Sequence, residues 1–487
     1  MAKQPGNSRK FKIYRYWWLL CLCLSFLSVG LLQKGAAEMP LFPPAAMANN
    51  PNFGARIQRT MGLLAASTPA QRQQVRILFY GQSITQQDWW QDVAQDLKQR
   101  FPSADLIVEN RAIGGFSAPI LIRPSEHDLY PFYPDLLIFH VYGGGEDYEA
   151  IIANVRRRTT SEILLHSDHI DWMPTGKSDD PEQLKRYEWH NTHSTKWLPE
   201  LADKYGCEIA EIRTPWLRYL KDNRLQPQQL LSDSIHLNSW GNFLLAALIK
   251  PHLRYNPNLP QTAQQDLVKT YTVGKDVKWQ DGKLVLEFEG NRIDAIADRT
   301  FKGEAISAKI AIDGKKPSEF PELYSITRPS PSLGVGWPAI IQISHQKPLI
   351  VEDWKAVITD INSDASKFKF DVIGSKTGYD GSGTNEEMFV SKSGRVAMEP
   401  KNWWLQNAYE YSKTPTPKGF EIFWQVKPMF VDSYILPQIA DSSREYPTTL
   451  AQNLSNSKHI LEIIPETDGT VPIKEIRVYR PPYIPAP

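Results

Sequence analysis

Three residues have the types and spacing of a hydrolytic catalytic unit. Ser83 follows a glycine-containing turn after an apolar run, and Asp233 and His236 lie much later in the chain. A serine hydroxyl is a weak nucleophile until an imidazole takes its proton, and that imidazole needs a carboxylate to hold its tautomer. Because Asp233 and His236 are three positions apart, a turn lets them meet directly. His236 is therefore the candidate base for Ser83, and Asp233 is the candidate carboxylate that orients it.

Two glycine-containing segments offer backbone N–H groups for an oxyanion. Gly114 and Gly115 form a pair after a second apolar run, and Gly143 to Gly145 follow a third. Glycine lets the backbone approach a ligand closely. A well-placed donor to an oxyanion is worth on the order of 10²–10³ in rate. Together with the serine, histidine and aspartate, such donors would complete a site for acyl transfer.

Alternating apolar segments predict the frame that must position these residues. Short apolar strands are expected at 75–80, 106–108, 136–141, 163–165 and near 209. The segments between them include ones whose apolar residues recur at helical spacing. Strands that are apolar on both faces and alternate with helices form a parallel sheet covered on each side. Ligands bind beyond the carboxyl ends of such strands, which is where the candidate residues stand. Residues 75–255 are thus predicted to form an α/β domain, after a lead-in segment at 38–74.

The second half of the chain follows a different pattern. Residues 256–269 are rich in Pro, Asn and Gln and predict a linker, after which the helical period disappears. Apolar residues flank three Asp-Gly pairs, at 281–282, 313–314 and 468–469, and Asp-Gly between alternating apolar residues is a strong hairpin indicator. Residues 270–487 are therefore predicted to form a mainly antiparallel β-sandwich domain.

The candidate segments resemble those of a known family. Gly81-x-Ser83-Ile84-Thr85, Asn110 through Gly115, and Asp233-x-x-His236-x-Asn238-x-x-Gly241 look like blocks I, II and V of the SGNH (GDSL) hydrolase superfamily, over about residues 75–255. The resemblance implies a flavodoxin-like three-layer αβα fold and a serine esterase. It also implies Ser83 as nucleophile and oxyanion donor, Gly115 as second oxyanion donor, His236 as general base and Asp233 as its partner.

Two departures from the family pattern affect the expected site. Gln82 stands where the family usually has Asp, and the segment 143–147 lacks the Asn that block III supplies as a third oxyanion donor. The alternatives for that donor are a backbone N–H of the glycine run, with Gly145 as the candidate, or the side chain of Tyr142 or His140. The residues expected to line the substrate pocket are Gln82, Tyr142, His140 and His166, although His140 also fits a hydrogen-bonded core position.

Composition and charge exclude several classes of protein. With 55 Lys and Arg against 54 Asp and Glu, the net charge of +1 gives no field that would gather nucleic acid or an anionic membrane.

Two segments resemble metal sites only in part. His166, Asp168 and His169 have the spacing of a metal-ligand pair but no evident third partner. The acidic segment 360–364 resembles a calcium loop, but Ala365 stands where such a loop needs Gly. No metal and no cofactor is expected.

The N-terminus has the layout of a secretory signal. Basic residues precede an apolar run from Trp17 to Leu32, and small residues follow at 35–37. A signal peptide at 1–37, cleaved after export, is favoured over a retained membrane anchor, and the protein is expected to be secreted or periplasmic. Only Cys207 lies beyond that segment, which excludes an intramolecular disulfide in the mature chain.

The interpretation that unites these features is an exported serine esterase. It would hydrolyse an O-acyl ester, on a carbohydrate, through an acyl-enzyme. One alternative is a sugar O-acyltransferase with the same three residues, and another is an inactive carbohydrate-binding protein on an SGNH scaffold. The tryptophans that are candidates for a sugar-stacking surface are Trp337, Trp354, Trp403, Trp404 and Trp424.

Overall fold

The structure is a computed structural model of the 487-residue chain. It describes residues 42–46, 50–143, 145–176, 179–260 and 266–482. The expected signal segment at 1–37 lies outside these ranges. Within them, every helix is too short or too polar to cross a membrane.

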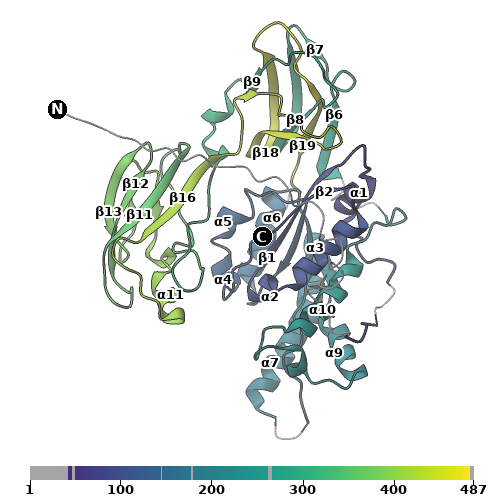
Figure 1. The fold of residues 1–487 in the computed structure, drawn as a ribbon, viewed down its shortest axis with the longest axis vertical. Coiled ribbons are helices and arrows are strands. Elements are labelled where there is room, and N and C mark those ends of the chain that lie inside the picture. The colour runs from purple at the N-terminus through teal and green to yellow at the C-terminus, as the bar shows by residue number, and fades with distance from the viewer. Residues whose placement is uncertain (1–41, 47–49, 144, 177–178, 261–265, 483–487) are drawn as a thin grey trace, which may run out of the picture. The chain divides into compact units, whose positions relative to one another are not determined.

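A five-stranded parallel sheet forms the centre of the first domain (Figure 1). Its order is β2-β1-β3-β4-β5, and all four pairings are parallel. The strands are β1 (Gln74–Gly81), β2 (Asp105–Asn110), β3 (Leu136–His140), β4 (Glu162–His166) and β5 (Glu208–Ala210). This is the strand order of flavodoxin-like folds, so the predicted fold class is confirmed.

Helices cover both faces of this sheet. They are α1 (Gln58–Ala66), α2 (Ser83–Gln86), α3 (Trp89–Arg100), α4 (Ala118–Leu121), α5 (Ser125–Asp128), α6 (Glu146–Arg158), α7 (Pro181–Thr192), a π-helical turn (His193–Trp197), α8 (Leu198–Tyr205), α9 (Arg213–Asp222) and α10 (Ser239–Ile249). Side chains of β1 alternate between two buried clusters, Ile77 and Phe79 on one face and Leu78 and Tyr80 on the other. The period of two in a buried strand thus produces a core on each side.

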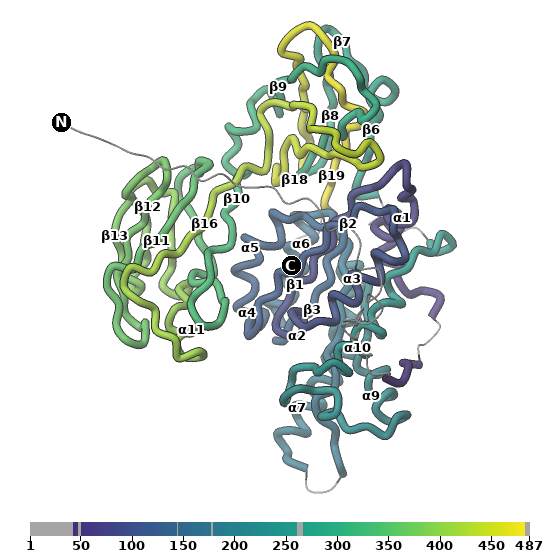
Figure 2. The backbone as a smooth tube through the Cα atoms, in the orientation of Figure 1, coloured from purple at the N-terminus to yellow at the C-terminus, as the bar shows by residue number. Residues whose placement is uncertain are grey.

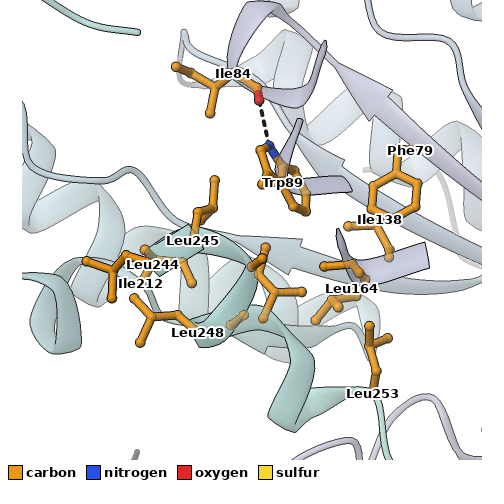
Figure 3. Close-up of a cluster of buried hydrophobic side chains, with 14 of the residues drawn as sticks. Phe79, Ile84, Trp89, Ile138, Leu164, Ile212, Leu244, Leu245, Leu248 and Leu253 are labelled. Carbon is orange, nitrogen blue, oxygen red and sulfur yellow. Dashed lines mark hydrogen bonds between the residues drawn. The ribbon is translucent and has the colours of Figure 1, made fainter. Parts of the chain in front are cut away.

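The first of these clusters lies between the sheet and helices α1, α3, α9 and α10. Figure 3 shows strand residues Phe79, Ile138 and Leu164 beside Trp89 and the leucines of α10. The indole N–H of Trp89 donates to the carbonyl oxygen of Ile84 at 2.6 Å, which satisfies a buried donor and fixes α3 after α2.

Part of the lead-in segment belongs to this core. Met61 and Leu64 of α1 are almost fully buried in the same cluster. The buried carboxylate of Glu162 accepts the backbone N–H of Thr60 at 2.7 Å, and that of Glu208 accepts the N–H of Gly54 at 2.8 Å. Acidic residues of β4 and β5 therefore bind the segment to the sheet.

The second half of the chain contains antiparallel strands, as expected. They form a seven-stranded sheet, a five-stranded sheet and a two-stranded sheet. The seven-stranded sheet holds β6 (Val268–Thr272), β7 (Trp279–Gln280), β8 (Lys283–Ala297), β9 (Ala308–Ile312), β17 (Ser433–Tyr434), β18 (Pro447–Pro465) and β19 (Ile473–Tyr479). The five-stranded sheet holds β10 (Tyr324–Ile326), β11 (Glu352–Ile361), β12 (Phe368–Gly374), β13 (Gly378–Thr384) and β16 (Glu421–Pro428).

The insertion is one of sequence: the strands of the five-stranded sheet lie along the chain between β9 and β17, which both belong to the seven-stranded sheet. The inserted segment also carries β14 (Phe389–Val390), β15 (Ala397–Met398) and α11 (Leu405–Ser412). The two larger sheets have separate clusters of buried apolar residues. Figure 2 shows β8 and β18 side by side although they are distant in sequence.

The Asp-Gly pairs behave differently from one another. The turn at Asp281-Gly282 joins the paired strands β7 and β8, as the hairpin pattern predicts. The hairpin expected at Asp468-Gly469 is wrong, because β8 lies between β18 and β19 and pairs with both. Local alternation indicates that a segment is a strand, but it does not indicate which strand lies beside it.

Candidate active site

Ser83 is placed by a tight turn at the end of β1. Gly81, the last residue of the strand, has φ +156°, and a Cβ there would lie 1.9 Å from the carbonyl oxygen of His140 on β3. Only glycine fits this approach. The chain then turns immediately, so that Ser83 becomes the first residue of α2. Its side chain lies at the carboxyl edge of the parallel sheet.

His236 and Asp233 are placed by the loop before α10. One carboxylate oxygen of Asp233 accepts the backbone N–H groups of Ile235 and His236, both at 2.7 Å. The side chain of Asn238 accepts the N–H groups of Trp240 and Gly241 and caps the helix. Side-chain acceptors therefore hold both ends of the loop that carries the imidazole.

The three residues form a continuous hydrogen-bonded chain. His236 Nδ1 lies 2.7 Å from the Asp233 carboxylate, and His236 Nε2 lies 2.9 Å from Ser83 Oγ. Hydrogen bonds from the backbone N–H of His236, from its ring and from the N–H of Ile235 lower the pKa of Asp233 to about 2. A carboxylate at this position favours the tautomer with hydrogen on Nδ1, which leaves Nε2 to accept the serine proton.

Two backbone N–H groups beside Ser83 are suited to hold an oxyanion. These are the N–H of Ser83 itself and the N–H of Gly115, which has φ +79°. In the described part of the chain, neither N–H donates to any acceptor. Both residues line the same cavity. Gly145, the candidate from the glycine run, precedes α6 and is outside the lining of this cavity.

The cavity at Ser83 has a volume of about 610 Å³ and is lined from both halves of the chain. The α/β domain supplies residues that include Gln82, Tyr142 and the glycine pair, and the inserted β-rich segment supplies Arg328, Gly334, Val335, Gly336, Trp337 and Tyr411. The rings of Trp337 and Tyr411 are 5.1 Å apart, and Tyr411 is 74% exposed. The cavity therefore has an aromatic wall facing the serine edge of the sheet.

An ion pair between a buried carboxylate and a partly exposed guanidinium joins the two halves at this cavity. Arg328 donates to both carboxylate oxygens of Asp128, at 2.6–2.9 Å, and to the carbonyl oxygen of Arg111 at 2.6 Å. Burial lowers the pKa of Arg328, but the adjacent carboxylate outweighs this effect and raises it. The guanidinium is thus held in its charged form at the cavity.

Gln82 lies beside the nucleophile and is buried. Its amide oxygen is 2.8 Å from Ser83 Oγ, so the hydroxyl has two acceptors in reach, this oxygen and His236 Nε2. The amide nitrogen of Gln82 has no hydrogen-bond partner among the described residues. Because amide orientation follows from the hydrogen-bond network, rotating the amide would make Gln82 a donor to Ser83 and leave the hydroxyl for His236.

The histidines expected to line the pocket lie behind its wall. His140 and His166 are buried, stack with ring centroids 4.3 Å apart, and are outside the cavity lining, whereas Tyr142 is part of it. Asp168 accepts from His140 at 2.8 Å and from His190 at 2.7 Å. Burial raises the pKa of Asp168, but these two hydrogen bonds outweigh it and hold the pKa well below the usual value.

Among the described residues there is no group of three or more His, Cys, Asp or Glu side chains arranged to hold a metal ion. The cluster instead pairs one buried carboxylate with two imidazoles.

The structure adds site residues that local sequence patterns did not assign. His169 Nε2 lies 2.9 Å from the carbonyl oxygen of Ile235, inside the loop that carries Asp233 and His236. Trp337 donates its indole N–H to the carbonyl oxygen of Gly114 at 2.6 Å. Trp337 is one of the five tryptophans that are candidates for a sugar-stacking surface, but its contact with Gly114 spans 223 positions and leaves no local signal in the sequence.

Comparisons with known proteins give structural neighbours only. The sequence matches no protein-family model, and no curated protein matches it significantly. A two-domain esterase active on acetylated mannans, co-crystallised with mannopentaose, is 14% identical over 87% of this chain and 95% of its own, with a TM-score of 0.31. Another similar structure is an α/β hydrolase from the metagenome of Lake Arreo, which is 18% identical over 39% of this chain and 100% of its own, with a TM-score of 0.32.

Two further neighbours match the first half of the chain. An acetylxylan esterase from Geobacillus stearothermophilus is 17% identical over 39% of this chain and 98% of its own, with a TM-score of 0.32. A putative GDSL-like lipase from Parabacteroides merdae is 17% identical over 38% of this chain and 98% of its own, with a TM-score of 0.33. At these values the function has to be argued from the geometry of the site.

Proposed function

We propose that this protein is a serine hydrolase that cleaves an O-acyl ester of a carbohydrate through an acyl-enzyme. The observation that carries the proposal is the chain of contacts from Asp233 through His236 to Ser83, at 2.7 and 2.9 Å, which ends in an open cavity. Separate elements supply the serine and the histidine, and both lie at the carboxyl edge of one parallel sheet, where α/β folds bind ligands.

The geometry supports a two-step reaction. Ser83 Oγ attacks the ester carbonyl carbon while His236 Nε2 takes the hydroxyl proton, and the N–H groups of Ser83 and Gly115 bind the resulting oxyanion. The bond from the acyl carbon to the sugar oxygen then breaks, and His236 returns the proton to that oxygen. In the second step water attacks the acyl-enzyme, His236 takes the water's proton and gives it to Ser83 Oγ, and the carboxylic acid leaves.

The cavity wall supports a carbohydrate as the alcohol part of the ester. Aromatic faces suit the C–H face of a sugar ring, and Trp337 and Tyr411 present two rings beside the nucleophile. The guanidinium of Arg328 adds charged donors for hydroxyl groups on the same wall. The secretory layout of the N-terminal residues agrees with a substrate outside the cytoplasm.

Covalent labelling tests the nucleophile. A fluorophosphonate should label wild-type protein on Ser83, and Ser83→Ala should lose both the label and hydrolysis of p-nitrophenyl acetate. Absence of labelling in folded wild-type protein would favour a binding protein. Acetylated manno- and xylo-oligosaccharides then test the sugar, with acetate release as the readout. Formation of acylated sugar when an unacylated acceptor is added would indicate an acyltransferase instead.

A further inference from the structure

One peptide bond in the proposed oxyanion site is held by a residue of the inserted β-rich segment. The indole N–H of Trp337 donates to the carbonyl oxygen of Gly114 at 2.6 Å. Gly114 C=O and Gly115 N–H belong to the same peptide unit. In a trans peptide these two groups point in opposite directions. Fixing the oxygen toward Trp337 therefore fixes the N–H on the opposite side.

This peptide has little else to hold it. Its flanks are anchored, because Ile113 donates to Gly81 at 2.9 Å and Phe116 donates to Ile113 at 3.2 Å. Within the described ranges, the Gly114 oxygen has no other donor and the Gly115 N–H has no acceptor. A Gly-Gly peptide lacks the Cβ atoms that would bar its rotation, so both orientations of the plane are sterically accessible.

Both the backbone and the ring of Trp337 have contacts that hold them in place. The backbone N–H and the hydroxyl of Ser332 donate to the Trp337 carbonyl oxygen, at 2.7 and 2.9 Å. The ring packs between Phe116 and Tyr411, with centroids 5.9 and 5.1 Å away. Its Cζ2 atom would lie 2.9 Å from a Cβ on Gly115, so the indole lies directly against the glycine pair.

We propose that Trp337 is a positioning residue for ester hydrolysis, which orients the Gly114–Gly115 peptide so that the Gly115 N–H binds the oxyanion. The inference rests on the proposed function. Accepting a hydrogen bond at the carbonyl also polarises the peptide and strengthens its N–H as a donor. The inserted segment thus contributes to the chemical step as well as to the wall of the cavity.

The test removes the indole N–H and follows a substrate too small to reach a sugar-binding surface. With p-nitrophenyl acetate, Trp337→Phe should lower kcat by about 10–100-fold, less than the roughly 10²–10³-fold loss of an oxyanion donor itself, and change KM by less than about 3-fold. Fluorophosphonate labelling of Ser83 should slow in parallel, because the phosphonyl oxygen occupies the same site. Replacing Trp337 by 3-benzothienylalanine, which keeps the bicyclic shape without the N–H, should give the same loss.

Trp404→Phe is the matched control. Trp404 packs against the same Phe116, at 5.4 Å between centroids, and its indole N–H has no partner among the described residues. Its kcat should stay within about 2-fold of wild type. Equal kcat in the Trp337 and Trp404 variants, or equal losses that follow a lowered Tm, would overturn the proposal. Full activity in Ser83→Ala would instead overturn the proposed function itself, whatever the Trp337 variants show.

Discussion

Ser83 Oγ lies 2.9 Å from His236 Nε2, although 153 positions separate the two residues. The distance depends on the end of β1, where Gly81 contacts β3, and on the loop that Asp233 holds before α10. Neither the serine turn nor the histidine loop would bring the two groups together alone. Residues that fix these two segments should therefore affect rate without touching substrate.

His169 is such a residue. Burial lowers the pKa of its imidazole to about 4, so near neutral pH it is uncharged and has one N–H, which donates to the carbonyl oxygen of Ile235. His169→Ala should lower kcat for p-nitrophenyl acetate by about 10-fold. His169→Gln places an amide N–H at a similar distance and should recover most of the loss. Failure of glutamine to restore kcat, with Tm unchanged, would mean that this hydrogen bond does not position the loop.

His127 should make the stability of the protein depend on pH. It is buried, its Nδ1 lies 2.9 Å from the carbonyl oxygen of Ile326, and its Nε2 accepts the N–H of Ile343 at 3.1 Å. Burial lowers its pKa to about 4. In the unfolded chain this imidazole binds a proton as the pH falls through about 6.5, whereas in the folded chain it stays neutral until about pH 4. The free energy of unfolding should therefore fall as the pH drops from 7 toward 4.

Urea unfolding at pH 7 and pH 5 measures this effect. The contribution of one such histidine over that interval is about 2 kcal/mol. His127→Gln should be less stable than wild type at pH 7 but should lose less stability between the two pH values. An unchanged difference between pH 7 and pH 5 in the variant would show that His127 is not a source of the pH dependence.

The ion pair between Asp128 and Arg328 should be important for stability. The Asp128 side chain is only 4% exposed and makes its charged contacts with one guanidinium. Removing one partner of a buried pair leaves an uncompensated charge and costs about 3–5 kcal/mol. Because Arg328 is partly exposed, Asp128→Asn should lower the free energy of unfolding by about 3 kcal/mol.

An exposed ion pair provides the control for this measurement. Lys367 and Glu386 lie 2.8 Å apart, with side chains 70% and 52% exposed. Solvent screens such a pair, so Glu386→Gln should change the free energy of unfolding by less than about 0.5 kcal/mol. Equal decreases in the free energy of unfolding for Asp128→Asn and Glu386→Gln would mean that burial of Asp128 does not strengthen its ion pair.

We expect the ring of Tyr411 to bind the sugar part of the substrate by stacking. Its ring is exposed at the cavity wall, and stacking of a sugar ring would be lost in Tyr411→Ala. KM for an acetylated oligosaccharide should rise about 5–20-fold, with a smaller effect on kcat for the same substrate. Phe423→Ala, at a half-exposed ring on β16 outside the cavity lining, should leave both constants unchanged. A KM equal to wild type in Tyr411→Ala would exclude stacking on this ring.

The first domain could be predicted because its strands carry their own signal. Segments such as Leu136–His140 are buried at every position and apolar at all but the last, which is typical of a sheet buried on both faces. Ser83 and the Asp233–His236 pair could be placed at one edge because each follows or precedes such an element. The contact between Trp337 and Gly114 had no equivalent signal, since it depends on how two parts of the chain pack.

The order of elements in the second half was also beyond local patterns. Two long strands, β8 and β18, pair with each other across register shifts, and the strands of the five-stranded sheet interrupt those of the seven-stranded one. Alternating apolar residues report burial of one face but contain no information about such an insertion.

The position of Trp337 also bears on the order of biosynthesis. The indole follows Gly114 by 223 positions, and the sheet that carries it is complete only when β16 has been made. Synthesis of Ser83 and His236 therefore precedes that of the aromatic wall, and every nascent polypeptide lacks a complete cleft until the ribosome has passed Tyr411.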